Sequence, residues 1–387
     1  MAFELAQKPI SRLRRYRLLA PSAGLRVSPL GLGSMAFGEK WLLDRSAVLG
    51  KCEKPTVFEI LDFFYEQGGN FIDTANNYQE GESEAWIGEW MVARSNREEL
   101  IIATKYSSAY TQDGSESTIR ANRGGNATKS MVQSLEKSLQ RLQTRYVDIL
   151  YVHYWDFTTS IPELMQSLNH LVASGKVLYL GVSDTPAWIV VKANEYARHH
   201  GLRQFSMYQG RWSAAQRDME TDIVPMCQAE GMAIVPWGTL GGGKLKHPRD
   251  HDPTQGRQFP DPPKEMRKIG EKIRNLAEQM KTHPTALALA YIMSKAPYTF
   301  PIVGVRTVEQ LKQNLQALEL QIDEGTVRAI DQCVPFDTRF PLSFLAGENI
   351  KGAFGPEDVY FTKECGTFDF PARPRAIPNY REETGDV

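Results

Sequence analysis

The chain has 387 residues, which is long for a single ordinary domain, and its 45 basic and 46 acidic residues leave a net charge of −1. This balance gives no electrostatic reason to expect nucleic acid or an anionic membrane as a partner. No apolar run approaches the ~20 residues that a membrane-spanning helix needs.

The N-terminal stretch and the cysteines bear on where the protein works. Residues 1–20 contain no long apolar segment behind their charges, so we expect no secretory signal. The four cysteines are far apart in the sequence and form no CxxC pair. This spacing argues against a disulfide framework or a zinc site and fits a reducing compartment. We therefore expect a soluble cytoplasmic protein without a bound metal.

Apolar strand-like segments alternate with helical patterns along the chain. The predicted strands lie at 30–37, 71–75, 100–105, 146–153, 177–183, 203–209, 232–237 and 299–305. Segments with helical spacing of apolar residues lie at 55–69, 83–95, 128–143, 161–176, 186–201, 222–231 and 307–318. The first of these helices ends at Gly68 and Gly69, as helix C-termini commonly do, and Pro162 fits the first turn of another.

Continuous apolar strands with helical connections indicate a parallel sheet that is covered on both faces. Such units predict an α/β fold of the (β/α)8 TIM-barrel type, with an open doubly wound sheet as the alternative. We expect one domain over 1–387, with the barrel at 16–332 and an irregular tail at 335–387. Polar insertions at 39–54 and 106–127 follow the first and third strands, where barrel enzymes build active sites.

The segment GLGSMA at 31–36 matches the GxGxxA pattern of dinucleotide-binding folds. That pattern requires a helix directly after it, and the following residues show no sustained helical spacing. A Rossmann-type dehydrogenase therefore remains only a minor alternative. We expect these glycines to let a strand end close to a bulky neighbour.

Three consecutive predicted strands end in ionisable residues, which are Asp73, Lys105 and His153, and Tyr78 follows Asp73 in the next loop. Charged side chains that lie together in a partly desolvated site must form ion pairs, because burying an unpaired charge is costly. A lysine ammonium near a phenol favours the phenolate, so we expect Lys105 to lower the pKa of Tyr78 from its usual value of ~10. The group suits protonation of a carbonyl while hydride arrives from elsewhere.

In residue type, order and strand placement, these residues match the catalytic tetrad of the aldo-keto reductases. The stretch NFIDTANNYQEGESEAWIGEW at 70–90 resembles the family's signature around its Asp and Tyr. The resemblance extends over about 16–332. It implies that Tyr78 is the general acid, that Lys105 and Asp73 tune it, and that His153 positions the substrate.

The resemblance also implies an extended NADP molecule bound without a Rossmann fold. GVSD at 181–184 resembles the family's usual GVSN, although Asp184 departs from the usual Asn. The residues expected at the nicotinamide and its carboxamide are Asp73, Ser183, Asp184, Gln209 and Trp237. The glycine-rich loop expected at the pyrophosphate contains Gly238, Leu240, Gly241, Gly242, Gly243 and Lys244. Arg306 is expected at the 2′-phosphate, with Gln310 and Asn314 toward the adenine.

Within the superfamily, the sequence most resembles fungal aryl-alcohol dehydrogenases and norsolorinic acid reductase-like proteins. This predicts NADPH-dependent reduction of aromatic aldehydes or ketones, reversibly, in fungal secondary metabolism. The residues expected to contact such a substrate are His153, Trp41, Tyr106 and Trp155, and those expected to add aromatic walls are Tyr110, Phe157, Phe336, Phe340 and Phe344. Potassium-channel β-subunits share the barrel, so a cofactor-loaded binding module with slow chemistry is the alternative. The oligomeric state leaves no trace in the sequence.

Overall fold

The computed structural model describes residues 8–41, 50–109, 119–243, 262–347 and 354–378. Eight parallel strands form one sheet in the order β10-β3-β4-β5-β6-β7-β8-β9. The strands are β3 (Gly31–Gly33), β4 (Phe71–Asp73), β5 (Ile101–Tyr106), β6 (Val147–Val152), β7 (Val177–Ser183), β8 (Phe205–Arg211), β9 (Ala233–Trp237) and β10 (Ile302–Gly304). The two edges meet where the Ile234 backbone bonds to Tyr298 and Phe300, at 2.9 Å each. The sheet is therefore a nearly closed barrel, as predicted.

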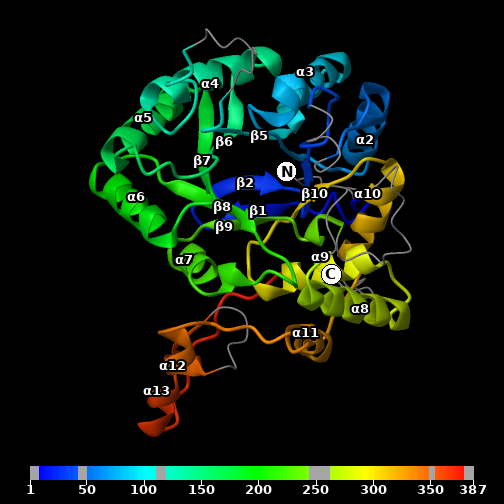
Figure 1. Cartoon of the computed structure of the whole chain (residues 1–387), viewed down its shortest axis with the longest axis vertical. Coiled ribbons are helices and arrows are strands. Elements are labelled where there is room, and N and C mark those ends of the chain that lie inside the picture. The colour runs from blue at the N-terminus through cyan, green and yellow to red at the C-terminus, as the bar shows by residue number, and fades with distance from the viewer. Residues whose placement is uncertain (1–7, 42–49, 110–118, 244–261, 348–353, 379–387) are drawn as a thin grey trace, which may run out of the picture.

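Helices surround the ring of strands (Figure 1). They are α2 (Lys54–Glu66), α3 (Glu82–Arg94), α4 (Thr128–Arg141), α5 (Ile161–Ala173), α6 (Ala187–His199), α7 (Ile223–Ala229), α8 (Lys264–Gln279), α9 (Pro284–Lys295), α10 (Val308–Leu315) and α11 (Glu324–Asp331). The sequence prediction omitted α8, α9 and α11. For α8 the signal was present, because its buried residues Met266, Ile269, Ile273 and Ala277 have helical spacing.

Alternation along the strands divides the apolar side chains between two cores. Phe71, Ala103 and Ile149 belong to a core inside the barrel, whereas Ile72 and Ile102 belong to the core between the sheet and the helices. Side chains two residues apart on one strand therefore share a side. This parity decides which of the predicted site residues face the barrel interior.

An antiparallel hairpin of β1 (Arg17–Ala20) and β2 (Ala23–Val27) was not predicted. Its residues Leu19 and Val27 pack in the inner core with Phe71, the first residue of β4. The hairpin thus closes the amino end of the barrel, and Figure 1 shows it crossing the ring of strands. The carboxyl ends of the strands are left to form the site.

The glycines of the GxGxxA segment have a packing role. A Cβ atom on Gly31 or Gly33 would lie 2.5 or 2.7 Å from side-chain atoms of Ile302 on the neighbouring strand. Glycine is therefore required for β3 to approach β10. The expectation that a strand ends here beside a bulky neighbour is confirmed.

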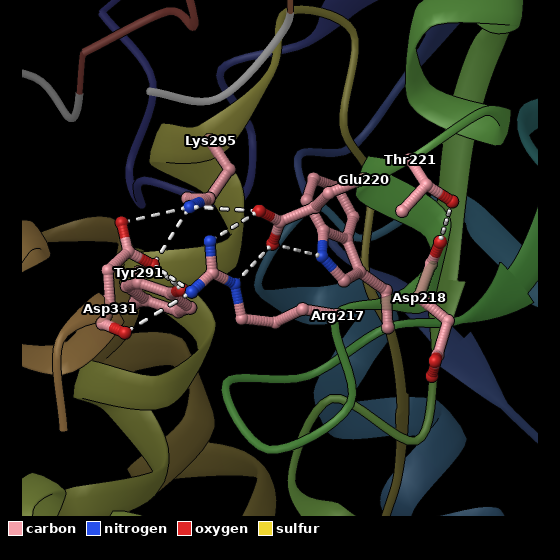
Figure 2. A network of polar contacts seen from close by, with 8 residues as sticks. Arg217, Asp218, Glu220, Thr221, Tyr291, Lys295 and Asp331 are labelled. Carbon is pink, nitrogen blue, oxygen red and sulfur yellow. Dashed lines mark hydrogen bonds and ion pairs between the residues drawn. The ribbon is translucent and has the colours of Figure 1, made fainter. Parts of the chain in front are cut away.

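Figure 2 shows a buried polar network that joins the loop after β8 to α9 and α11. Arg217 donates to Glu220 at 2.7 Å, and Lys295 lies 3.3 Å from Glu220 and 2.9 Å from Asp331. Two cations thus face two carboxylates. The indole N–H of Trp212, at the start of the loop, donates to Glu220 at 3.0 Å. The network therefore fixes the loop that follows β8.

Beyond α11 the chain leaves the barrel, and α12 (Leu342–Ala346) and α13 (Tyr360–Glu364) project from it (Figure 1). The ring of Phe336 lies 4.7 Å from the Arg217 guanidinium, at the point where the tail departs. Phe340 and Phe344 are 81% and 62% exposed on the projecting arm. The structure therefore places Phe340 and Phe344 away from the barrel mouth, contrary to the expectation from the sequence.

Two further features follow from a search of the described part of the chain. None of its helices combines the length and the apolar character needed to cross a membrane. Nor do the described residues bring together three or more His, Cys, Asp or Glu side chains in a group that could hold a metal ion.

Candidate active site

The carboxyl ends of β4, β5 and β6 bring three predicted site residues to one end of the barrel. Asp73 ends β4, Lys105 is the penultimate residue of β5, and His153 directly follows β6. Phe71, Ala103 and Ile149 face the barrel interior. Asp73 lies two residues after the first of them, Lys105 two residues after the second, and His153 four residues after the third. Parity therefore turns all three side chains into the barrel mouth.

Lys105 and Asp73 form a buried ion pair. The lysine Nζ donates to Asp73 Oδ1 at 2.5 Å and to the Thr74 carbonyl at 2.8 Å, and the two paired side chains are 0% and 3% exposed. Gln209 Nε2 donates to the other carboxylate oxygen at 2.8 Å. Burial lowers the pKa of Lys105, but Asp73 and Tyr78 outweigh it, so the lysine pKa is raised and the side chain stays charged.

Tyr78 lies beside the lysine of this pair. Lys105 Nζ is 5.1 Å from the centre of the Tyr78 ring, and the ring of His153 is 6.1 Å from that of Tyr78 in an edge-on arrangement. Burial raises the pKa of Tyr78, and the opposing effect of Lys105 is smaller. The expectation that Lys105 brings this pKa below its usual value is therefore wrong for this structure. The phenol stays protonated at neutral pH.

His153 is a neutral imidazole. Burial, with a smaller contribution from the Lys105 charge, lowers the pKa of His153 to about 3. Its Nδ1 atom is buried and has no hydrogen-bond partner in the described part of the chain. The ring therefore retains a polar atom that a bound molecule can use.

The ends of β7, β8 and β9 form the other side of the mouth. Ser183 and Gln209 are paired in register and both are buried. Trp237 ends β9, is 37% exposed, and donates its indole N–H to Asp184 at 3.3 Å. Asp184 lies just past β7 with a left-handed φ of 40°. The structure thus brings these four predicted cofactor residues together.

The loop after β9 is an open, glycine-lined turn. Gly238, Gly241, Gly242 and Gly243 all have positive φ, at 69°, 62°, 66° and 94°. Among the residues that the structure describes, none would lie within 4 Å of a Cβ atom on Gly243. Leu240, half-buried, packs against the outer core, and the predicted residue Lys244 lies outside the described residues. This loop leaves room for a ligand close to its backbone.

The loop after β10 presents a half-buried cation at a helix N-terminus. Thr307 caps α10 by accepting from the Gln310 N–H at 3.2 Å, and the Gln310 side chain accepts from the Arg306 N–H at 2.9 Å. Burial lowers the pKa of Arg306, and within the described ranges no carboxylate lies within ion-pair distance of its guanidinium. Asn314 is buried one turn further along α10. A guanidinium beside the N–H groups of a helix N-terminus can bind an anion.

The predicted substrate residues do not all meet. Trp41 is 7% exposed, and its ring lies edge-on to Tyr78 at 6.5 Å. Trp155 is half-buried and lies edge-on to the exposed ring of Phe157 at 6.4 Å. Tyr106 belongs to the outer core, and its hydroxyl bonds to the Asn126 carbonyl at 3.3 Å.

Tyr106 is adjacent to Lys105 on β5, so strand alternation directs it away from the barrel interior. Its position does not support the predicted substrate contact, and parity along the strand is the signal that could have shown this. Tyr110 lies outside the described residues.

Tyr151 is an interior residue that the sequence interpretation overlooked. Its ring centre is 5.7 Å from Lys105 Nζ, and the side chain is fully buried. A Cβ atom on Gly181 would lie 2.4 Å from this ring, so glycine makes room for it. Because Tyr151 precedes His153 by two residues, strand parity could have revealed it.

A buried lysine–aspartate pair beside a protonated tyrosine and a neutral histidine, at the carboxyl end of a (β/α)8 barrel, defines a class of barrel-fold oxidoreductases. The model of the Aldo/keto reductase family matches residues 29–335. The chain therefore belongs to the aldo/keto reductase family, which confirms the resemblance seen in its motifs.

Three relatives illustrate the similarity. A norsolorinic acid reductase of Aspergillus flavus is 53% identical over 345 residues, which cover 89% of this chain and 87% of that protein. An aryl-alcohol dehydrogenase of Pestalotiopsis microspora is 48% identical over 386 residues, covering 99% and 98%. An aryl-alcohol dehydrogenase [NADP(+)] of Phanerodontia chrysosporium is 46% identical over 349 residues, covering 87% and 90%.

Proposed function

We propose that this protein is an NADPH-dependent reductase that converts aromatic aldehydes or ketones into alcohols, reversibly, within fungal secondary metabolism. The observation that carries the proposal is the buried Lys105–Asp73 pair beside protonated Tyr78. The names of the relatives, norsolorinic acid reductase and aryl-alcohol dehydrogenase [NADP(+)], support the substrate class and the cofactor. The activity is assigned to one barrel domain that carries residues 335–387 as a tail.

The residues around the mouth fit a nicotinamide dinucleotide. When bound, such a cofactor supplies the hydride. Ser183, Gln209 and Trp237 would hold the nicotinamide end, since buried polar groups and an exposed indole meet there. Buried Thr239 Oγ1 has no hydrogen-bond partner among the described residues, and a Cβ atom on nearby Gly243 would meet none of them, so a diphosphate would fit beside this part of the loop. Arg306 would bind the 2′-phosphate, which favours NADPH over NADH.

In carbonyl reduction, Tyr78 donates its phenolic proton to the carbonyl oxygen. Because burial keeps its pKa raised, the phenol carries that proton throughout the neutral range. The resulting phenolate forms beside the Lys105 ammonium, whose charge stabilises it. Asp73 keeps the lysine charged and in place, and neutral His153 can hydrogen-bond the carbonyl oxygen. General acid catalysis of this kind contributes roughly 10²–10⁴-fold.

Aromatic side chains at the mouth support an aromatic substrate. Trp41 lies against Tyr78, Trp155 follows His153 by two residues in the chain, and Trp237 is partly exposed at the end of β9. Flat apolar walls with few charged groups suit a planar ring better than a sugar, which requires many hydrogen bonds.

A substrate panel with NADPH tests this proposal. We expect higher kcat/KM for substituted benzaldehydes and anthraquinone-like ketones than for hexoses and short aliphatic aldehydes. A preference for hexoses would contradict the substrate class. Absence of NADPH oxidation with every carbonyl would contradict the proposed reaction and favour the binding-module alternative.

A further inference from the structure

The turn that carries Tyr78 has a strained backbone. Gln79 and Glu80 have φ of 49° and 58°, and Gly81 follows with φ of 91°. Residues other than glycine rarely adopt this left-handed conformation, and they keep it only where their surroundings impose it. The contacts of this turn should therefore explain how it is held.

Gln79 holds the turn from one side. Its side chain is fully buried, and its Nε2 atom donates to the carbonyls of Met35 at 3.3 Å and Gly50 at 3.2 Å. Its Oε1 atom accepts from the Trp41 N–H at 3.1 Å. These bonds tie the residue after Tyr78 to the loop that follows β3.

Arg141, the last residue of α4, holds the turn from the other side. Its Nη1 atom donates to the Asn76 carbonyl at 2.9 Å and lies 3.2 Å from Glu84 Oε2. A Cβ atom on Gly81 would lie 2.3 Å from the guanidinium carbon, so the guanidinium crosses directly over that glycine. Arg141 therefore contacts the chain both before and after Tyr78.

Glu84 fixes the guanidinium and links it to the strand that carries the catalytic lysine. Its side chain is 0% exposed, and its Oε1 atom accepts from Thr104 Oγ1 at 2.6 Å. Thr104 directly precedes Lys105 on β5. One buried carboxylate thus connects the turn of Tyr78 to the strand of Lys105.

We propose that Gln79, Arg141 and Glu84 are positioning residues for carbonyl reduction, which clamp the strained turn and thereby place the Tyr78 hydroxyl over Lys105. This inference rests on the proposed role of Tyr78 as proton donor. The clamp residues act through the backbone on either side of Tyr78. Their removal should lower kcat while leaving the cofactor-binding rim intact, because a small displacement of a reacting group is costly.

The test compares purified full-length variants Gln79→Ala, Arg141→Lys and Glu84→Gln. We expect kcat to fall by roughly 10- to 100-fold in each, with an unchanged Kd for NADPH in a fluorescence titration. Glu80→Gly is the matched control, since glycine readily adopts the left-handed conformation of this position and the substitution removes no clamp contact. Its kcat should equal that of the parent. Glu84→Gln, which keeps the shape of the side chain, carries the test if Arg141→Lys does not fold.

A double-mutant cycle with Tyr78→Phe separates positioning from general stability. In that background the clamp substitutions should cause no further loss in the residual single-turnover rate, because the hydroxyl that they place is absent. Further losses equal to those in the parent would overturn the inference. The inference would also be overturned if the clamp variants kept the parental kcat while Tyr78→Phe was inactive. Full activity of Tyr78→Phe itself would instead overturn the proposed function and the clamp with it.

Discussion

Lys105 donates a 2.5 Å hydrogen bond to Asp73 inside the barrel mouth, and neither side chain has appreciable contact with solvent. Each charge is tolerated there because the other is present. The lysine of the pair lies 5.1 Å from the centre of the Tyr78 ring, so the integrity of the pair affects both the stability of the barrel and the chemistry at its mouth.

Asp73→Asn should impair both properties. The substitution leaves Lys105 buried without its carboxylate, and breaking a buried pair in this way costs about 3–5 kcal/mol. Burial then lowers the pKa of Lys105 with only Tyr78 left to oppose it, so the ammonium supports a phenolate less well. Urea unfolding measures the first effect and kcat the second. Parental stability would show that the pair contributes nothing net to the fold.

Tyr78→Phe should reduce kcat for carbonyl reduction by roughly 10²–10⁴-fold, because the proton donor is removed. The Kd for NADPH should remain near that of the parent, since the hydroxyl acts in the transition state. Stopped-flow turnover and fluorescence titration provide the two measurements. Activity within a few-fold of the parent would remove Tyr78 from the mechanism.

Stability should depend on pH through His153. Its pKa is about 3 in the folded protein, below the ordinary value of 6.5, so the unfolded chain binds more protons between these limits. The free energy of unfolding therefore rises with pH through this window. The part of it that comes from neutral His153 is lost as the pH falls toward 3. His153→Gln should reduce the slope of the free energy of unfolding against pH by up to about 1.4 kcal/mol per pH unit.

Urea unfolding across this acidic window measures the slope for the His153 variant. The control is His199→Gln at an exposed position of α6, which removes one histidine without touching the site. An equal slope in the parent and in His153→Gln would show that His153 is not held neutral.

Arg306→Ala should raise the KM for NADPH and leave that for NADH nearly unchanged, because only NADPH carries the 2′-phosphate. Lys312→Ala, at an exposed position of α10, the helix that follows Arg306, serves as the control. Initial rates with both cofactors decide the matter. If Arg306→Ala weakened both cofactors equally, Arg306 would support the loop and the phosphate contact would lie elsewhere.

Lys295→Met should destabilise the fold by about 3–5 kcal/mol, since among the described residues it leaves Arg217 as the one cation facing the carboxylates of Glu220 and Asp331 in a buried network (Figure 2). Lys176→Met removes a lysine from an ion pair that is about half exposed, with Glu136, and should cost at most about 1 kcal/mol. Urea unfolding of the two variants gives the comparison. Equal losses would mean that the buried network contributes no more than a surface pair.

Much of the barrel and part of the site could be predicted from the local pattern of residues. Parallel strands align their carboxyl ends, so apolar segments that end in Asp73, Lys105 and His153 predict three neighbouring side chains at one mouth. Tyr106 and Tyr151 could have been placed by the same reasoning. Alternation along a strand turns Lys105 inward and Tyr106 outward, and it turns Tyr151 to the side of His153.

The tertiary structure alone decided how Tyr78 is placed and which way its pKa shifts. Arg141 meets Asn76 and Glu84 across 65 and 57 positions of sequence, and no local period encodes that meeting. The raised pKa of Tyr78 depends on burial outweighing a nearby ammonium, two opposing effects that the packed structure alone sets against each other. The same holds for Phe340 and Phe344 of the tail, which are apolar yet exposed where they lie, because burial depends on the neighbours that the fold supplies.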